Sequence, residues 1–298
     1  MREFIALVPL MLFFSLVTVF GSPTEMLHSH ADGLSKTVFS DKMRVIFLVG
    51  LEGVGHHYLR LALSEASQKL PNLIQEASAC NCSWQSGTIS QYIADLDLAR
   101  QQMQSFAQVK EGLQEGQAKL VHFVHCVSYP YSGGVHKVFQ YTDLRMLADL
   151  AEEGGVDFRV VYLRRSAGDM VVADTVHRQF ANHLDDGAES SSEEQFVWYL
   201  KVLFADMGVM HSLLSELDPA FVVCHDYSAL GNPDQAKEIA TFIAPNEDMA
   251  QQITTSLVAT AQEKHAAGSS SLPLEGAEVI VDRMQRKLDA FEGIYCGL

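Results

Sequence analysis

The chain has 298 residues, and its 21 Lys and Arg against 37 Asp and Glu give a formal net charge of −16. So acidic a composition argues against general nucleic-acid binding, because that needs basic side chains to replace the counterions around the phosphates. The length and the hydrophobic content of 48% suit one large α/β domain or two small ones.

Residues 1–21 are predicted to be a targeting segment. Arg2 precedes the almost unbroken apolar stretch Phe4–Phe20, and small residues lie near a cleavage point before Ser22. The stretch is long for the hydrophobic part of a signal peptide and slightly short for a transmembrane span. A cleaved signal peptide and a membrane anchor therefore both stay open. Either way, we expect the rest of the chain to face the secretory lumen, in the Golgi or after secretion.

Residues 22–43 are polar and irregular, which predicts a stem or flexible segment. The tripeptide Asn81-Cys82-Ser83 is a glycosylation sequon and fits a lumenal protein. Five cysteines allow at most two disulfides. Cys126 and Cys224 lie in apolar, strand-like runs and are expected to be buried thiols. The better disulfide candidates lie in less regular segments: Cys80, Cys82 and Cys296.

The apolar run Val45–Val49 is typical of a buried strand, and the glycine-rich loop Gly50–Gly55 follows it. A helical pattern comes next, and free backbone N–H groups at such a junction favour an anion. The loop has the G-x-x-x-x-G spacing of a phosphate-binding loop, but His56 and His57 replace the Lys and Ser/Thr that normally follow. We interpret the loop as a cradle for a phosphate or sulfate group, unlike that of an ordinary ATPase. A tight turn before a packed helix is the plainer alternative.

Apolar runs and helical patterns alternate along the rest of the chain. Further strands are predicted at Lys119–Val127, Phe158–Leu163 and Ala220–Cys224. Helices are predicted at His57–Lys69, Gln91–Leu113, Asp143–Glu153, Ala167–Phe180, Phe196–Leu217, Pro233–Ile243, 247–264 and 276–291. This alternation predicts an α/β fold with parallel strands and with helices on both faces of the sheet. In such sheets a ligand lies beyond the carboxyl ends of the strands.

The segments that follow the strands resemble those of the sulfotransferase superfamily. Gly53-Val54-Gly55-His56-His57 falls where the family has its 5′-phosphosulfate loop, commonly K-S-G-T-T or R-T-G-T-T. The segment Val160–Asp169 resembles the family's 3′-phosphate segment, a strand followed by R-x-x-x-D and a helix. Arg165 and Asp169 take the two named positions of that pattern.

A third segment carries the same likeness. Phe221–Ile243 resembles the family's later strand, which is followed by Y-x-x-L, a proline and a helix. Tyr227 and Leu230 match the tyrosine and leucine of that pattern. The likeness spans roughly residues 44–245.

The resemblance implies a three-layer α/β/α P-loop fold with a central, mainly parallel sheet, formed by residues 44–298. It also implies a lumenal sulfotransferase that moves a sulfuryl group from 3′-phosphoadenosine 5′-phosphosulfate to a hydroxyl of a glycan or another acceptor. No metal is expected, because the sulfuryl group carries less charge than a phosphoryl group. The donor-binding residues would be Gly53, Val54, Gly55, His56, His57, Arg165 and Asp169. His56 and His57 are also the expected catalytic residues, since a neutral histidine can act as a general base.

The sequence departs from the family pattern at important positions. Gly53 stands where the loop's basic residue is expected, and Ala173 stands where a serine is expected eight residues after the arginine. A catalytically degenerate protein of the same fold, which binds an anion or a partner, is therefore the alternative. A P-loop nucleotide kinase or NTPase is a weaker one, in which Asp226 would hold magnesium although the loop lacks Lys and Ser/Thr.

Overall fold

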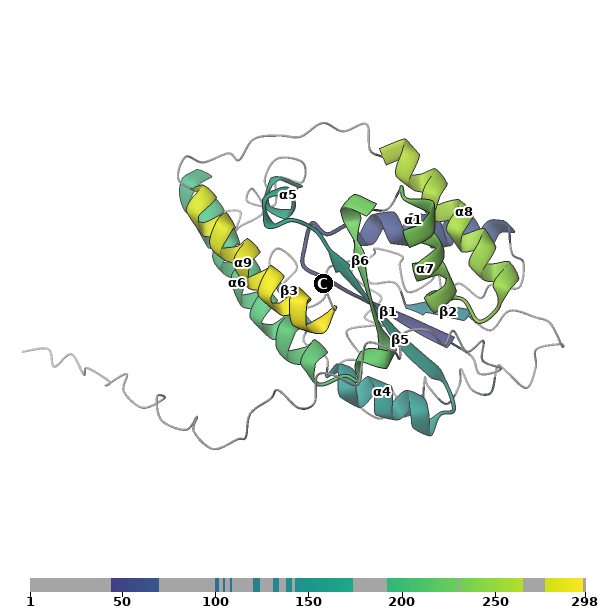
Figure 1. The fold of residues 1–298 in the computed structure, drawn as a ribbon. Helices are drawn as coiled ribbons and strands as arrows, with labels where there is room; N and C mark the ends of the chain where they lie inside the picture. Colours follow the sequence, from purple (N-terminus) through teal and green to yellow (C-terminus); the bar gives the residue numbers. More distant parts are fainter. Residues whose placement is uncertain are drawn as a thin grey trace, which may run out of the picture. The chain divides into compact units, whose positions relative to one another are not determined.

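Four parallel strands form the central sheet of the computed structural model (Figure 1). The strand order is β2-β1-β5-β6, with bounds of Arg44–Val49 for β1, Leu120–Phe123 for β2, Asp157–Arg164 for β5 and Val222–Asp226 for β6. Phe47 pairs with Phe123 on one side and with Val160 on the other, so β1 lies between β2 and β5. The predicted parallel pairing of the first strand with the second and third is therefore confirmed.

The structure describes residues 44–69, 100–101, 104, 108, 120–123, 131–133, 138–140, 143–173, 192–229, 231–264 and 277–296. All of them belong to one unit, Thr37–Leu298, whereas Met1–Lys36 forms another. Several predictions lie outside the described residues. They concern the targeting segment 1–21, the stem 22–43, the sequon at Asn81, most of Gln91–Leu113, Leu230, and the cysteines Cys80, Cys82 and Cys126.

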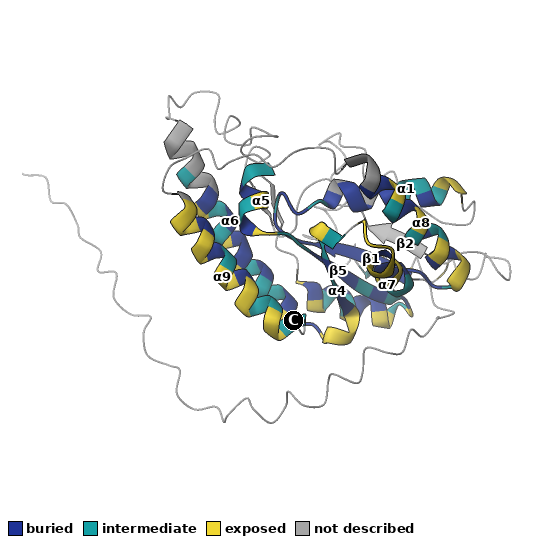
Figure 2. Ribbon diagram, turned by 45° about the horizontal axis from the view of Figure 1, so that its top comes forward, coloured by how far each residue is buried: buried dark blue, intermediate teal, exposed yellow. Residues whose placement is uncertain are grey.

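Helices lie on both sides of the sheet, as Figure 1 shows. On one side lie α1 (His56–Lys69), α7 (Pro233–Ile243) and α8 (Glu247–Lys264); on the other lie α4 (Leu144–Glu153), α5 (Ala167–Val172), α6 (Ser192–Ser215) and α9 (Ala277–Tyr295). On the first side α8 packs against α1 and α7, and on the second side α9 packs against α5 and α6. Figure 2 shows that the buried residues lie on the faces that these helices turn inward. The structure is thus an α/β fold built on a parallel sheet.

All six residues of β1 are buried, as its apolar run predicted. Arg44 is the one charged residue of this strand, and its side chain is only 1% exposed. Its Nε lies 2.7 Å from Oδ2 of Asp157. Its Nη1 also donates to the carbonyl oxygens of Phe242 and Ala244 at the end of α7. A buried charge needs such partners. Arg44 therefore ties the amino end of the sheet to α7.

Polar caps fix the starts of two helices that the sequence predicted. The carboxylate of Asp143 accepts the N–H of Met146 at 2.9 Å, and α4 begins at the next residue. Asn232 precedes α7 and accepts the N–H of Asp234 at 2.9 Å, while Pro233 occupies the first turn. Such side chains satisfy N–H groups that have no partner within the helix. These helix starts were predictable because the caps are local in sequence.

Some local predictions differ from the structure. Helix α1 begins at His56, one residue before its predicted start. The strands β3 (Tyr131–Gly133) and β4 (Val138–Gln140) form an antiparallel pair that the sequence analysis did not predict. Strands of three residues are too short to display a recognisable alternation. The described part of the second predicted strand, Lys119–Val127, is β2.

Cys224 of β6 and Cys296, directly after α9, form a disulfide with their Cα atoms 5.8 Å apart. The choice of Cys296 as a disulfide candidate is confirmed, but the prediction that Cys224 is a buried thiol is wrong. An apolar strand indicates burial only, and the partner cysteine follows α9, 72 residues further along the chain. Among the described residues, none of the helices combines the length and apolar character that a membrane span requires.

Candidate functional site

The topology places one crevice of the sheet at the carboxyl ends of β1 and β5. The next strand in the chain, β2, pairs with one side of β1, and β5 pairs with its other side. The direction in which strands are added therefore reverses at β1. The helices that follow β1 and β5, α1 and α5, lie on opposite sides of the sheet (Figure 1). Open α/β sheets bind ligands at such a switch point. The segments that meet there are Gly50–Gly55 after β1 and Arg165–Asp169 after β5.

At two positions of the glycine loop, Gly50–Gly55, the backbone has a conformation that only glycine adopts easily. Gly53 has a φ of 84° and Gly55 a φ of 106°, both in the left-handed region. The carbonyl oxygen of Gly55 accepts the N–H of Tyr58 at 2.9 Å and so begins α1. At Gly50, a Cβ atom would lie 2.9 Å from the carbonyl oxygen of Leu163, so glycine permits the close approach of β1 and β5.

Arg165 joins the segment after β5 to the glycine loop. Its Nη1 donates to the carbonyl oxygen of Gly53 at 2.8 Å. Its Cζ lies 4.3 Å from the ring centroid of Tyr227, which follows β6. The structure thus brings Arg165 to the glycine loop, as the sequence analysis expected, and adds a cation–π contact that it did not. The role of Arg165 toward a nucleotide stays a prediction.

The ring of Tyr227 covers Gly55. A Cβ atom on Gly55 would lie 2.4 Å and 2.5 Å from two ring carbons of Tyr227. The same ring meets Tyr58 of α1 edge-on, with centroids 6.2 Å apart. Burial raises the pKa of Tyr58, whose hydroxyl donates to the carbonyl oxygen of Leu257 in α8. The family resemblance singled out Tyr227, but its packing on Gly55 was not predicted.

The two expected catalytic histidines open α1. His56 is 7% exposed, and the side chain of His57 lies outside the described residues. Val54 of the glycine loop is buried, and its N–H donates to the carbonyl oxygen of Leu51 at 3.3 Å. The arrangement puts consecutive backbone N–H groups at the start of a long helix, where the helix dipole favours an anion.

Two side chains accept backbone N–H groups at the start of α5. Ser166 precedes the helix, and its Oγ accepts the N–H of Asp169 at 3.1 Å. The N–H of Ala167 donates to Oε1 of Gln285 in α9 at 2.7 Å. Asp169, the last residue of the predicted 3′-phosphate segment, is exposed in the first turn. Gln285 was not predicted to take part, because nothing in the sequence relates it to residues 118 positions earlier.

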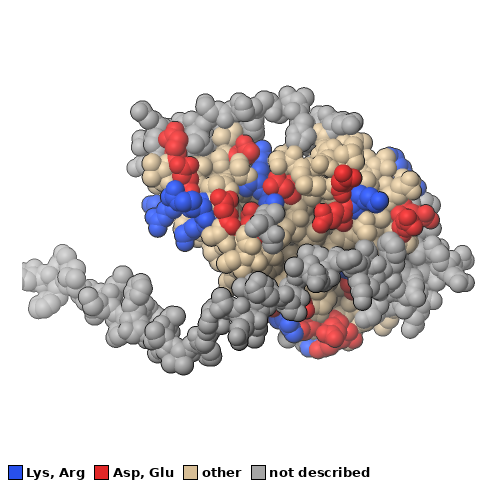
Figure 3. Space-filling model, viewed as in Figure 1, with Lys and Arg blue, Asp and Glu red and all other residues tan. Residues whose placement is uncertain are grey.

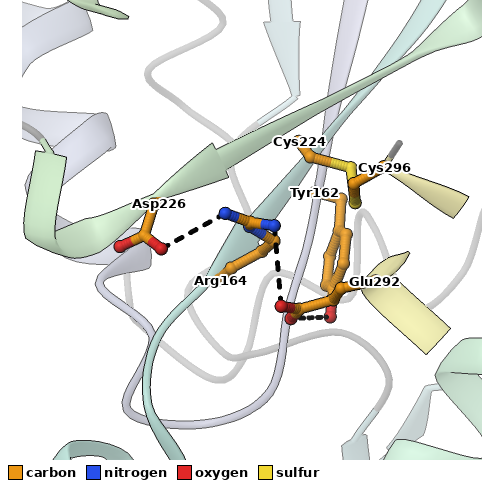
Figure 4. Close-up of a disulfide and its surroundings, with 6 residues drawn as sticks. All are labelled: Tyr162, Arg164, Cys224, Asp226, Glu292 and Cys296. Atoms are coloured by element: carbon orange, nitrogen blue, oxygen red, sulfur yellow. Dashed lines mark hydrogen bonds and ion pairs between the residues drawn. A yellow bond between two sulfur atoms is a disulfide. The ribbon is translucent and has the colours of Figure 1, made fainter. Parts of the chain in front are cut away.

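Arg164 lies between two carboxylates beside the disulfide (Figure 4). Its Nη2 is 3.2 Å from Oδ2 of Asp226, and its Nη1 is 3.6 Å from Oε2 of Glu292 in α9. The hydroxyl of Tyr162 donates to Oε1 of Glu292 at 3.1 Å. Burial raises the pKa of Glu292, and Arg164 opposes that shift. The sequence analysis did not single out Glu292. The signal that could have found it is its position four residues before Cys296, a disulfide candidate.

Asp226, the residue considered for magnesium, is bonded within the protein. Besides its ion pair with Arg164, its Oδ1 accepts the N–H of Ser228 at 2.8 Å and the hydroxyl of Ser228 at 2.6 Å. Within the part of the chain that the structure describes, no three His, Cys, Asp or Glu side chains gather as metal ligands would.

Side chains of the glycine loop, the end of β5 and α9 meet in a packed junction that leaves no space for a water molecule. The residues that meet there include Leu51, Val54, Arg164, Arg165, Leu288 and Glu292. Small-molecule sites usually measure about 300–1,000 Å³, and no cavity of that kind is open at this junction, so a nucleotide would need the surrounding side chains to move. Figure 3 shows acidic and basic side chains interspersed on the face seen in Figure 1, with basic ones gathered over α9. The positive charge available to an anion at the crevice is therefore local.

Comparisons with known proteins add little to this description. No protein-family model matches the chain, and no curated protein sequence matches it. One solved structure, the crystal structure of APE1195, aligns with 56% of this chain and 97% of its own at 14% identity, with a TM-score of 0.27. A similarity at that level carries no argument about fold or function.

Proposed function

We propose that this chain is a sulfotransferase of the secretory lumen with a three-layer P-loop fold. It would move a sulfuryl group from 3′-phosphoadenosine 5′-phosphosulfate to a hydroxyl of a glycan or another acceptor. The observation that supports this most is the 2.8 Å hydrogen bond from Arg165 to Gly53, at the switch point of the sheet. It joins the two segments that resemble the family's 5′-phosphosulfate loop and 3′-phosphate segment.

Each of these segments has a part in the proposed binding. Backbone N–H groups of residues 53–57 would hold the sulfate and the 5′-phosphate, as N–H groups at a helix start commonly do. The N–H of Val54 would have to give up its 3.3 Å bond to the carbonyl oxygen of Leu51 to take part. Arg165 would bind the 3′-phosphate, because a guanidinium has five donors and uses one on Gly53. Asp169 would complete this segment from the first turn of α5.

The proposed chemistry is an in-line displacement at sulfur. The acceptor oxygen forms a new S–O bond, the bond to the 5′-phosphate oxygen breaks, and 3′-phosphoadenosine 5′-phosphate leaves. A neutral His56 or His57 would take the acceptor's proton. Positioning and hydrogen bonds to the sulfuryl oxygens would supply most of the rate, by analogy with phosphoryl transfer.

Ligand-dependent thermal stability tests the proposal most directly. A ligand that binds the folded state raises the melting temperature. We expect 3′-phosphoadenosine 5′-phosphate to stabilise the protein and ATP with magnesium to leave it unchanged. Stabilisation by ATP with magnesium alone would instead support the NTPase alternative.

The pH dependence of two variants tests the histidines. If His56 or His57 must be charged to hold sulfate, binding weakens as the pH rises through the range in which histidines titrate. If one must be neutral as a base, turnover rises over that range while binding changes little. Binding and turnover of the parent, His56→Ala and His57→Ala from about pH 5.5 to 8 separate the two roles. Unchanged behaviour of both variants at every pH would remove the histidines from the site.

A catalytically degenerate binding protein is the second candidate, and two contacts favour it. Gly53 replaces a basic residue, and its carbonyl oxygen takes up a donor of Arg165. The N–H of Ala167 is occupied by Gln285 instead of being available to a ligand. Binding of 3′-phosphoadenosine 5′-phosphate without sulfate transfer to any hydroxylated acceptor would identify this function.

The secretory location is part of the proposal. The disulfide between Cys224 and Cys296 supports it, because disulfides persist in oxidising compartments and are rare in the cytosol. Mass analysis of the mature N-terminus would distinguish a cleaved signal peptide from a membrane anchor in residues 1–21. A cytosolic location of the intact protein would contradict this part.

A further inference from the structure

Helix α9 is attached to the carboxyl edge of the sheet by three kinds of bond. The disulfide joins Cys296 to Cys224 of β6. Glu292 accepts the hydroxyl of Tyr162 at 3.1 Å and lies 3.6 Å from Arg164. About two turns before Glu292 in the helix, Gln285 accepts the N–H of Ala167 at 2.7 Å.

These bonds hold both ends of the turn that presents Arg165. Arg164 directly precedes it and is fixed between Asp226 and Glu292. Ala167 follows two residues later and is fixed by Gln285. A binding group that is held in place before the ligand arrives gains affinity, because less conformational freedom is lost on binding.

The end of α9 depends on the disulfide more than the rest of the helix does. Val281, Met284 and Leu288 are buried and hold the earlier turns. The last turn contains Gly293, which lowers helix stability, and Ile294, which is 75% exposed. Its apolar contacts are those of Phe291 and Tyr295, two rings that are only half-buried. Local opening is easiest where few apolar contacts are made. Breaking the disulfide would therefore loosen the turn that carries Glu292 first.

We infer that the last turn of α9 is a redox-controlled clamp on the candidate nucleotide site. With the disulfide formed, Glu292 holds Arg164 and thereby positions Arg165 against the glycine loop. With the disulfide reduced, the last turn of α9 loosens, the turn after β5 becomes mobile and the affinity for the nucleotide falls. The effect on affinity rests on the proposed function, whereas the loosening does not.

The switching reaction is thiol–disulfide exchange with a dithiol. A thiolate of the dithiol attacks one sulfur of the Cys224–Cys296 bond, and the other cysteine leaves as a thiolate that is then protonated. The second thiol of the reagent resolves the mixed disulfide. The protein gains two thiols, and the dithiol is oxidised to its own disulfide. Both cysteines are only partly buried, so a dithiol can reach the bond.

Hydrogen exchange on the full oxidised chain, with and without dithiothreitol, tests the loosening without any nucleotide. We expect exchange to rise roughly tenfold or more in both 292–296 and 164–167, while α7 and α8 stay unchanged. The double variant C224S/C296S should behave like the reduced parent and no longer respond to dithiothreitol. A response that persists in this variant would come from other cysteines and would overturn the clamp.

Calorimetry with 3′-phosphoadenosine 5′-phosphate tests the link to the site. We expect the dissociation constant to rise roughly tenfold on reduction, equivalent to about 1.4 kcal/mol. Glu292→Gln should raise the dissociation constant by a similar factor while the disulfide stays intact. This variant replaces C224S/C296S in the test if the double serine variant does not fold. Asp282→Ala, on the exposed face of α9, should change neither exchange nor affinity.

The outcomes keep the two proposals apart. Looser 292–296 with unchanged exchange in 164–167 would overturn the clamp, and so would an unchanged dissociation constant on reduction. If no state of the protein binds the nucleotide, the proposed function fails. In that case the clamp is judged by hydrogen exchange alone: a rise in residues 164–167 on reduction supports control of the turn by α9, and no rise overturns it.

Discussion

The guanidinium of Arg165 lies over the ring of Tyr227, with its Cζ 4.3 Å from the ring centroid. The same side chain donates to the carbonyl oxygen of Gly53. One arginine thereby connects the segments that follow β1, β5 and β6. The candidate site is built from three strand ends held by this side chain.

Replacing Arg165 tests its proposed role in anion binding. Arg165→Ala should weaken binding of 3′-phosphoadenosine 5′-phosphate by about 1.5–3 kcal/mol, the usual worth of a charged hydrogen bond. Arg165→Lys keeps the charge but loses the planar fork and should recover only part of the affinity. Arg145→Ala is the control, because Arg145 is 56% exposed and pairs with Asp149 four residues away on α4. Titration calorimetry measures all three, and parent-like binding by Arg165→Ala would make the assignment wrong.

Gly55→Ala should destabilise the fold and abolish anion binding. A side chain is strained at a φ of 106°, and its Cβ would lie 2.4 Å from a ring carbon of Tyr227. Gly155→Ala is a matched control, because Gly155 has a φ of 70° with nothing within 4 Å of an added Cβ. The control should lose about 1–2 kcal/mol from backbone strain alone. Urea unfolding should show a clearly larger loss for Gly55→Ala, and equal losses would contradict the packing of Tyr227 on the loop.

Removing the disulfide should lower the stability of the whole chain. Cys224 and Cys296 are separated by 72 residues, so the bond restricts a long loop in the unfolded state. The double variant C224S/C296S should lose about 2–5 kcal/mol in the free energy of unfolding. Denaturant unfolding of the oxidised parent, the reduced parent and the variant measures this. A reduced parent as stable as the oxidised one would show that the bond contributes nothing to stability.

Acid should destabilise the protein because two of its histidines, His211 and His225, are neutral in the folded state. Burial, helped by Lys287, lowers the pKa of His211 to about 4, and burial lowers the pKa of His225 to about 4 against the opposing effect of Asp226. Between pH 6.5 and 4 the unfolded chain binds protons that the folded chain does not. The stabilising effect of the neutral form is therefore complete above pH 6.5 and is lost as the pH falls toward 4.

His211→Phe should reduce this acid sensitivity. The His211 ring stacks on Phe291 with centroids 3.8 Å apart, and phenylalanine keeps that stack without titrating. We expect the variant to retain about 1–3 kcal/mol more of its stability than the parent between pH 6.5 and 4.5. Denaturant midpoints across this range provide the measurement. Parallel pH profiles of variant and parent would exclude His211 as a source of the sensitivity.

The sequence by itself predicted the elements of the sheet and the position of the candidate loop. The apolar run of β1, the caps Asp143 and Asn232 and the glycines of Gly50–Gly55 act on residues within one or two turns of themselves. Alternating strands and helices then require parallel pairing, because a parallel connection has to cross over the sheet. These features were predictable because their physical causes are local or follow from chain connectivity.

Only the tertiary structure decided what surrounds the loop. Tyr162 and Glu292 are 130 residues apart, Ala167 and Gln285 are 118 apart, and Cys224 and Cys296 are 72 apart. Each pair forms because α9 docks on the face of the sheet that includes Cys224 and Tyr162, and helix docking depends on the strand order and on packing over the whole sheet. An apolar strand indicates that Cys224 faces the interior, but not which segment lies against it. The partners of Arg164, Cys224 and Gly55 were therefore decided by packing between distant segments, which no local pattern records.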